Sequence, residues 1–157
     1  MASGKDNPDS QAASGDIPDA GYRQLADFRR CIRKFLHFSE ELARGNGIEP
    51  QQHQLLLAIK GLPGDARPTI AALSRQLYLR HHSTVELVNR LEERGAVRRR
   101  QGTEDRREVL VEITRRGEDL LRQLSVLHWE ELRVSGPALS EALHAVVHPA
   151  RQKRRPA

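Results

Sequence analysis

The chain has 157 residues, close to the length of one domain, and 38% of them are hydrophobic, which supports a modest core. Charged residues make up 30%, and 26 Lys and Arg against 21 Asp and Glu leave a formal net charge of +5. No apolar run approaches the roughly 18–20 residues that cross a bilayer, and the acidic start does not resemble a secretory signal. The single cysteine excludes an internal disulfide framework or a thiolate-rich zinc site. We therefore expect a helix-rich cytoplasmic protein that does not bind membranes.

Positive charge is concentrated in two parts of the chain. In the middle of the chain, residues 21–64 carry a net charge of +3 and residues 65–116 one of +4, and the last seven residues carry +4. Residues 1–20 and 117–150 are each net acidic. A surface that binds a polyanion such as DNA requires clustering of this kind. The alternative is a general bias toward arginine without functional meaning.

The first part of the chain is predicted to be a leader followed by two helices. Residues 1–17 have no apolar pattern and are expected to be disordered. Apolar side chains three and four positions apart predict a helix over residues 22–44, which the Gly-Asn-Gly sequence at 45–47 ends. Pro50 opens a second helix, whose apolar residues 55–59 are expected to be buried.

Two further helices and a hairpin are predicted next. Thr69 is a good N-cap for a short helix that buries Ile70, Leu73 and Leu77. A longer helix follows over about 81–94 and ends at Gly95. Between residues 97 and 113 the hydrophobic period changes from about 3.6 toward 2, which predicts a β-hairpin.

The last part of the chain is predicted to be two helices. Thr114 is positioned to cap a long helix. The sequence Ser135-Gly136-Pro137 is expected to interrupt that helix before a short amphipathic segment.

One face of the helix over 81–94 carries side chains that can read bases. His82, Glu86, Asn89 and Glu93 share one side of a helical wheel, opposite an apolar side that can pack on the preceding helix. Asn can pair with adenine and Glu can accept a hydrogen bond from cytosine. The N-terminal end of such a helix points into the major groove. The alternative is an ordinary solvated face.

The hairpin is rich in arginine. Its five arginines are Arg98, Arg99, Arg100, Arg106 and Arg107. Only Glu104 and Asp105 in the loop are expected to oppose them, and this charge density suits a wing that lies along a DNA minor groove. Side chains alternate along a strand, so the five cannot all face one partner. Asp105 is expected to hold a neighbouring arginine through charge-assisted hydrogen bonds.

Three stretches together resemble the MarR family of transcriptional regulators: PQQHQLLLAIKG at 50–61, LYLRHHSTVELVNRLEERGAVRR at 77–99 and DRREVLVEIT at 105–114. The resemblance spans roughly residues 22–148. Its most specific part is the wing pattern of an Asp, an Arg two residues later and a strand that ends in Ile-Thr. Tyr78 departs from the pattern, because many members have Gly in that turn. The turn can form if the φ angle of Tyr78 stays negative.

The resemblance implies a mainly α-helical winged helix-turn-helix with a β-hairpin wing and with N- and C-terminal dimerisation helices. It implies a sequence-specific DNA-binding transcriptional regulator. This regulator would be a homodimer that represses transcription from a pseudo-palindromic operator, and a small phenolic ligand would relieve the repression. The partners would be double-stranded DNA, a second copy and a small aromatic ligand. The residues predicted to contact DNA are Arg80, His81, His82, Ser83, Thr84, Glu86, Asn89, Arg90, Arg106 and Arg107, and Asp105 is predicted to stabilise the wing.

The predicted domains follow from these elements. They are a leader (1–17), an N-terminal dimerisation helix (18–48), a winged helix-turn-helix domain (49–114), C-terminal dimerisation helices (115–148) and a basic tail (149–157). The terminal helices carry long apolar stripes that the small domain between them cannot cover, and a second chain would cover them. The alternative is a helical pair within a monomer.

The weaker features leave alternatives open. His37, Phe38, His53 and Trp129 are candidates to line a ligand pocket, and core packing is the alternative for each. Cys31 has four cationic neighbours that favour a reactive thiolate. A repressor that senses oxidants through Cys31 is therefore an alternative function, unless Cys31 is an ordinary helix cysteine. A non-specific nucleic-acid-binding protein is a further alternative.

No enzyme, cofactor or metal site is predicted. The sequence contains no nucleophile–base pairing, no Gly-rich phosphate loop and no metal-ligand cluster. His144 and His148 are four residues apart and can share a helix face, but no third ligand is evident.

Overall fold

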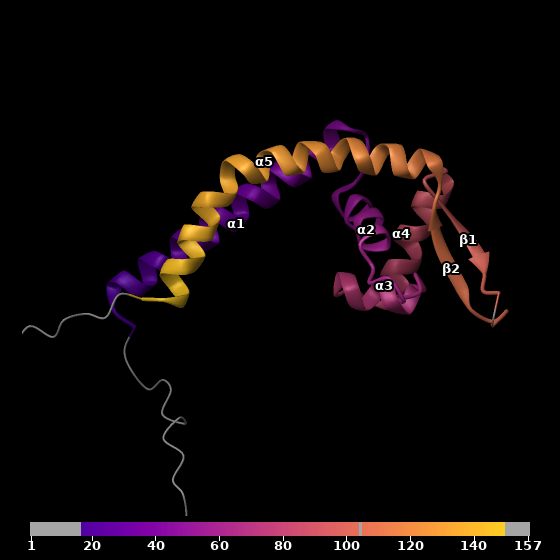
Figure 1. The fold of residues 1–157 in the computed structure, drawn as a ribbon, viewed down its shortest axis with the longest axis horizontal. Helices are drawn as coiled ribbons and strands as arrows, with labels where there is room; N and C mark the ends of the chain where they lie inside the picture. The colour runs from indigo at the N-terminus through magenta and orange to yellow at the C-terminus, as the bar shows by residue number, and fades with distance from the viewer. Residues whose placement is uncertain (1–16, 104, 150–157) are drawn as a thin grey trace, which may run out of the picture.

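The structure is a computed structural model that describes residues 17–103 and 105–149. Its elements in chain order are α1 (Asp19–Gly45), α2 (Pro50–Lys60), α3 (Ile70–Leu77), α4 (His81–Glu93), β1 (Val97–Gln101), β2 (Val109–Ile113) and α5 (Arg115–Val147). In Figure 1, α1 and α5 run side by side as a long arched pair, and the other elements form a lobe beneath one end of α5. This arrangement confirms the predicted mainly helical fold with a two-stranded antiparallel hairpin. None of the helices in the described ranges is long and apolar enough to cross a membrane.

The core of the lobe forms where α2, α3, α4 and the hairpin meet the first half of α5. Its large apolar side chains that are fully buried are Leu55, Leu56, Leu73, Val88, Leu91, Val97, Val111 and Leu124. Burying each such side chain contributes about 1.5–3 kcal/mol. The predicted burial of residues 55–59 holds for Leu55, Leu56 and Ala58, whereas Ile59 is partly buried and Leu57 is 50% exposed.

Thr114 joins the hairpin to α5. Its hydroxyl accepts a hydrogen bond from the N–H of Gly117 at 3.2 Å, which confirms the predicted N-cap, and donates one to the carbonyl of Gly95 at 2.6 Å. A Cβ atom on Gly117 would lie 2.0 Å from the carbonyl oxygen of Ala96. The first turn of α5 therefore packs directly on the backbone that connects α4 to β1.

The predicted interruption of the last helix is wrong, because α5 is one continuous helix that contains Pro137. Proline lacks the N–H that would bond to the carbonyl four residues earlier, so it removes one bond of the helical ladder. The hydroxyl of Ser135 donates to the carbonyl of Glu131 at 2.9 Å, a contact that tends to bend helices. The helix accommodates both features by curving along α1, as Figure 1 shows.

Three helices end in the same hydrogen-bonded turn. Gly47 after α1, Tyr78 after α3 and Gly95 after α4 have φ angles of 72°, 53° and 69°. In each turn the next residue donates its N–H to the carbonyl five positions back, over Ile48–Ala43 (3.1 Å), Leu79–Ser74 (3.0 Å) and Ala96–Leu91 (2.9 Å). This pattern is the Schellman motif, which favours glycine at the left-handed position.

The turn at Tyr78 therefore forms with a positive φ angle, and a negative φ is not the condition for it. The turn between α3 and α4 uses the same geometry as the two glycine turns, and an L-residue in this geometry costs about 1–2 kcal/mol. The Tyr78 side chain is 97% exposed, so no packing offsets that cost.

Replacing Tyr78 by Gly should stabilise the fold by about 0.5–1 kcal/mol, since relief of the left-handed strain exceeds the extra entropy of glycine in the unfolded chain. Thermal denaturation would show this as a rise of about 1–3 °C in Tm. Tyr78→Ala is the matched control, because it removes the ring and keeps the strain. An equal gain from Tyr78→Ala would mean that the exposed ring, and not the backbone, is the source of the cost.

Candidate nucleic-acid interface

A buried pair of hydroxyl groups holds α3 against α4. Ser74 Oγ lies 3.0 Å from Thr84 Oγ1 and 2.7 Å from the carbonyl oxygen of Ile70. Thr84 Oγ1 lies 3.3 Å from the carbonyl oxygen of Arg80, at the start of α4. Thr84 has no exposed surface. Its predicted contact with DNA is therefore wrong, because the side chain points into the helix pair and fixes its geometry.

The remaining residues predicted on α4 are accessible. His82, Glu86, Asn89 and Glu93 are exposed on one face, and Val88 and Leu91 are buried on the other, as expected. The other candidates near the start and middle of α4 are Arg80, His81 and Arg90, which are exposed, and Ser83, which is half-buried. The helix thus presents a continuous polar face to solvent.

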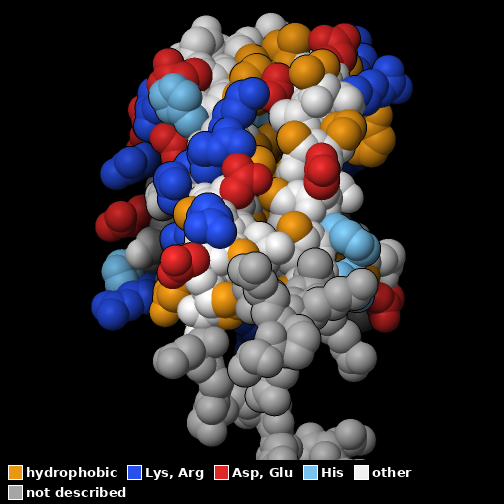
Figure 2. All heavy atoms as spheres, turned by 90° about the vertical axis from the view of Figure 1, so that its left-hand side faces the viewer, with side chains coloured by type: hydrophobic (Ala, Val, Ile, Leu, Met, Phe, Trp, Pro, Cys, Tyr) orange, Lys and Arg blue, Asp and Glu red, His pale blue; other side chains and the backbone are white. Residues whose placement is uncertain are grey.

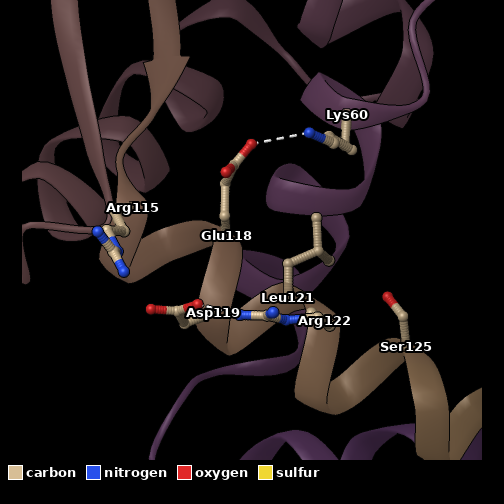
Figure 3. A pocket seen from close by; sticks show the side chains of 7 residues that line it. All are labelled: Lys60, Arg115, Glu118, Asp119, Leu121, Arg122 and Ser125. Atoms are coloured by element: carbon tan, nitrogen blue, oxygen red, sulfur yellow. Dashed lines mark hydrogen bonds and ion pairs between the residues drawn. The ribbon is translucent and has the colours of Figure 1, made fainter.

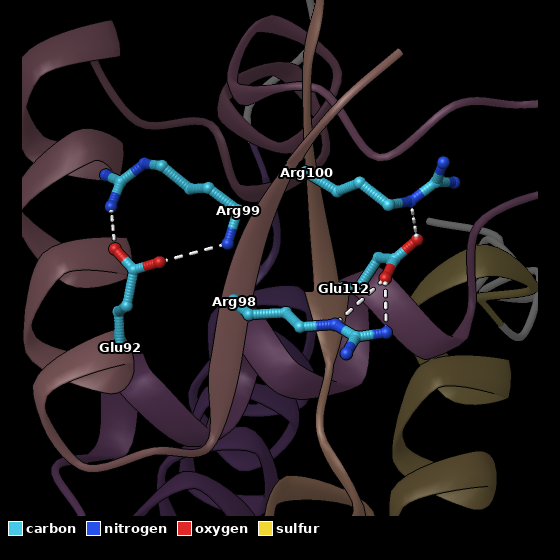
Figure 4. A network of polar contacts seen from close by, with 5 residues as sticks. All are labelled: Glu92, Arg98, Arg99, Arg100 and Glu112. Carbon is cyan, nitrogen blue, oxygen red and sulfur yellow. Dashed lines mark hydrogen bonds and ion pairs between the residues drawn. The ribbon is translucent and has the colours of Figure 1, made fainter. Parts of the chain in front are cut away.

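Two of the hairpin arginines are paired with one carboxylate. Arg98 lies directly opposite Glu112 across the strands, and its Nη2 is 3.0 Å from Glu112 Oε2. Arg100, two positions further along β1, bonds to the other oxygen of Glu112 (Figure 4). The hydrogen bond from Arg100, and secondly that from Arg98, holds the pKa of Glu112 below its usual value.

Arg99 points to the opposite face of β1 and reaches α4. Its backbone N–H donates to Glu92 Oε1 at 3.0 Å, and its guanidinium forms an ion pair with the same carboxylate (Figure 4). Its Nη2 also donates to Asn89 Oδ1 at 2.6 Å. The expectation that Glu104 and Asp105 alone oppose the arginines is therefore wrong. Strand alternation separates Arg99 from its neighbours, as predicted.

The two arginines at the tip of the wing differ from those on β1. Within the described part of the chain, Arg106 and Arg107 are exposed and form no ion pair. Asp105 Oδ1 accepts a hydrogen bond from the backbone N–H of Arg107 at 2.8 Å. The expected bond from Asp105 to an arginine side chain is thus replaced by one to the backbone, which closes the turn and leaves the guanidinium of Arg107 in solvent.

Residues just before α3 hold the wing near its tip, and no sequence pattern singled them out. Arg67 Nη1 lies 2.8 Å from Glu108 Oε2, and the N–H of Val111 donates to the carbonyl of Pro68 at 2.8 Å. Gly102 lies against this contact, since a Cβ atom there would be 3.2 Å from both Arg67 Nη2 and Glu108 Oε2. No motif marks Arg67 in the sequence, because its partner lies 41 positions away along the chain.

The four predicted ligand-pocket residues do not converge. His53 is buried and stacks on His128 with ring centroids 4.7 Å apart, and Phe38 meets the same ring edge-on at 5.9 Å. His37 is exposed. Trp129 is 66% exposed and lines a separate hollow of about 390 Å³ on α5.

His128, which the sequence did not single out, is the centre of this cluster. Its Nδ1 donates to the carbonyl of Leu124 at 2.8 Å, so in the neutral ring Nε2 accepts from the hydroxyl of Ser39 at 2.7 Å. The bond to Ser39 connects α5 to α1, while the stacked His53 belongs to α2. The cluster therefore lies where the lobe meets the helical pair.

A hollow of about 730 Å³ lies between the end of α2 and the start of α5 (Figure 3). Its charged lining residues are Lys60, Arg115, Glu118, Asp119 and Arg122. Lys60 Nζ is 2.7 Å from Glu118 Oε1, and this hydrogen bond holds the pKa of Glu118 below its usual value. Asp119 forms an ion pair with Arg122. Because four of the five charged side chains pair with one another and both signs are present, the hollow does not present a single-sign binding surface.

The structure gives little support to Cys31 as a redox site or to the C-terminal histidines as a metal site. Cys31 is half-buried, and the nearby Arg30 is paired with Asp27 at 2.6 Å. His144 and His148 are exposed with ring centroids 4.7 Å apart. Between residues 17 and 149, leaving out residue 104, no group of three or more His, Cys, Asp or Glu is placed to hold a metal ion.

Comparison with known proteins points to one family. Residues 46–108 match the model of the MarR family. AbsC, a MarR family transcriptional regulator from Streptomyces coelicolor, superposes with a TM-score of 0.69 at 18% identity, over 87% of this chain and 95% of AbsC. No curated protein sequence matches the chain.

Two further solved structures share the fold and contain bound molecules. A MepR mutant from S. aureus bound to an oligodeoxyribonucleotide has a TM-score of 0.60 at 17% identity, over 80% of this chain and 92% of MepR. CouR from Rhodococcus jostii bound to p-coumaroyl-CoA has a TM-score of 0.60 at 20% identity, over 90% of this chain and 98% of CouR.

Burial, and secondly the neighbouring His128, lowers the pKa of His53 to about 4 from 6.5. The unfolded chain therefore binds more protons than the folded chain between these values, so stability is lost as the pH falls from about 6.5 toward 4. In urea unfolding, His53 should make the free energy of unfolding about 2 kcal/mol lower at pH 5 than at pH 7. His53→Phe should remove most of that difference, and His81→Gln, which changes an exposed histidine, should keep it. The same pH dependence in the wild type and His53→Phe would refute the assignment.

Proposed function

We propose, from the premise that residues 46–108 form a MarR family domain in a MarR-type winged-helix fold, that the chain is a sequence-specific DNA-binding transcriptional regulator. In this proposal α4 enters the major groove and the wing tip contacts the flanking minor groove. The observation that carries the proposal is the combination of an exposed polar face on α4 with the exposed Arg106 and Arg107 at the wing tip, which form no ion pair with the residues that the structure describes. We propose no catalytic activity and no cofactor, and a cytoplasmic location follows from the proposed partner.

The DNA-contacting set is proposed without Thr84. The buried Ser74–Thr84 contact positions α4, and the exposed residues on its N-terminal half and outer face supply the groups that contact DNA. The wing adds Arg106 and Arg107, while Asp105 shapes the turn that presents them. The MepR mutant bound to an oligodeoxyribonucleotide supports DNA as the partner of this fold.

We further propose that the chain is a homodimer that represses a pseudo-palindromic operator. Large apolar side chains remain exposed along α1 and α5: Tyr22, Leu25, Leu36, Val126, Trp129, Val134, Leu143 and Val147. Figure 2 shows the end of the helical pair that lies away from the lobe, where hydrophobic side chains lie between charged ones. A second copy would bury such a surface and would place two α4 helices on successive major grooves.

A small ligand is proposed to relieve repression. The cluster of His53, His128 and Phe38 joins the lobe to the helical pair, so a molecule that bound beside it would alter how the two parts are held. CouR bound to p-coumaroyl-CoA supports a phenolic compound as the class to test first. Thermal-shift measurements with phenolic acids and their acyl thioesters would identify a binder.

The wing contact can be tested by Arg107→Ala. Fluorescence anisotropy with a duplex from its own promoter region should show a loss of about tenfold in affinity, since one exposed phosphate or groove contact disappears. The slope of log K against log salt should fall by about 0.9. Arg23→Ala removes an exposed arginine from α1 and should leave both quantities unchanged. Unchanged operator affinity in Arg107→Ala would rule out the wing contact, and equal affinity for scrambled DNA in the wild type would rule out a sequence-specific regulator.

The dimer can be tested by Leu143→Asp. Leu143 on α5 is 45% exposed, and a charge there should raise the dimer dissociation constant by about tenfold or more in analytical ultracentrifugation. Leu57→Asp is the matched control, because Leu57 is 50% exposed but lies on α2 in the lobe. A monomeric wild-type chain, or an equal effect of the two variants, would contradict the proposed dimer surface.

A further inference from the structure

Arg99 is the one arginine of the run 98–100 that touches α4. In β1, side chains at 98 and 100 point to Glu112, so the alternation of the strand directs the side chain at 99 to the other face. There it meets Glu92 and Asn89, which are three residues apart on α4 and so lie on the same side of the helix. The wing strand thereby contacts a residue of the helix face proposed to read DNA.

The contact is held by several bonds at once. Glu92 accepts both the backbone N–H and the guanidinium of Arg99, and these bonds leave the fork of the guanidinium in a fixed orientation. The Arg99 side chain is only 29% exposed, compared with 68% for Arg98. Arg99 is therefore a preorganised group, and its Nη2 is directed toward Asn89.

The chemistry of the two side chains decides which end of the amide Arg99 meets. A guanidinium has donors only, so the Asn89 atom 2.6 Å from Nη2 is the amide oxygen. The NH₂ group of Asn89 then remains for the groove. An adenine contact needs both ends of the amide, because the oxygen accepts from the adenine amino group while the NH₂ donates to N7.

We propose that Arg99 sets the base preference of α4 by occupying the amide oxygen of Asn89, so that Asn89 selects the acceptor edges of guanine or thymine over adenine. The second lone pair of the oxygen does not restore the adenine contact, because an amino group there would lie beside the positive guanidinium. Guanine O6 and N7, or thymine O4, accept from the free NH₂ without that conflict. Arg99 acts as a positioning residue, and the inference rests on the proposed function of α4.

The base preference can be measured with duplexes that carry each of the four base pairs at every operator position. In the wild type, the position whose discrimination disappears in Asn89→Ala should favour guanine or thymine over adenine on the contacted strand. In Arg99→Ala the freed amide should bind adenine, which shifts the preference at that position by about tenfold. Arg99→Lys should shift it in the same direction with less loss of overall affinity, since one ammonium can keep the bond to Glu92 but cannot span both partners.

Arg98→Ala is the matched control. It removes the same charge from the neighbouring position of the same strand, so it should lower affinity at every operator position alike and leave the preference unchanged. Melting temperatures of all variants establish that each is folded. In the absence of DNA, the ¹⁵N–¹H signals of the Asn89 side-chain amide should move in Arg99→Ala and stay in place in Arg98→Ala.

The possible results separate the inference from the function on which it rests. A wild type that prefers adenine at the Asn89-dependent position would overturn the inference, as would an unchanged preference in both Arg99 variants or an Asn89 amide signal that does not move in Arg99→Ala. The proposed regulator would stand in all three cases. Wild-type binding without any sequence preference would instead overturn the proposed function.

Discussion

The close approach of α5 to the backbone between α4 and β1 is the constraint on which the rest of the structure depends. A Cβ atom at Gly117 would be 2.0 Å from the carbonyl oxygen of Ala96, so only glycine lets the two segments meet. Thr114 reinforces the junction, because one hydroxyl caps α5 and also binds the end of α4. The proposed reading helix, the wing and the long helix therefore share one junction, and a displacement of any of them acts on the other two.

The arginine surplus has two structural roles. Arg98 and Arg100 share Glu112, and Arg99 is shared between Glu92 and Asn89, so the run of three arginines mainly holds the wing to itself and to α4. The two arginines at the tip are left exposed. A count of positive residues thus overstates the charge available to a polyanion, while the pairing determines where that charge is available. In the proposed complex the wing approaches DNA tip first, because two carboxylates offset most of the charge of the three arginines at its base.

Local sequence patterns were sufficient to predict most elements of the fold. The N-caps at Thr69 and Thr114, the glycine turn at Gly95 and the alternation of residues 97–113 are each determined by side chains close in sequence. The resemblance to the MarR family placed these elements in the same order. The errors arise where a more distant contact overrides a local preference. Pro137 does not end α5, because the helix continues on both sides of the lost bond and packs along α1.

The candidate site was predictable only in outline, for the same physical reason. The helical wheel identified the exposed face of α4 but could not reveal that Thr84, at its edge, would face Ser74. Arg67, Glu92 and His128 act through partners that only the folded chain brings near, and no spacing rule marks them. Tyr78 shows a further limit. The hydrogen bonds of the turn require a positive φ angle at Tyr78, which a tyrosine disfavours. The residue type alone therefore does not reveal this backbone geometry.

The continuity of α5 has a geometric consequence for any assembly built on it. At 1.5 Å per residue, its 33 residues span about 50 Å from the wing junction to the far end of the helical pair. A continuous helix fixes both the distance and the rotation between its ends. Each inserted or deleted residue changes the length by about 1.5 Å and rotates everything beyond it by about 100°. If two copies meet through the far ends, the number of residues in α5 sets both the separation and the relative rotation of the two lobes. Its length would then be under as strict a constraint as the residues that touch DNA.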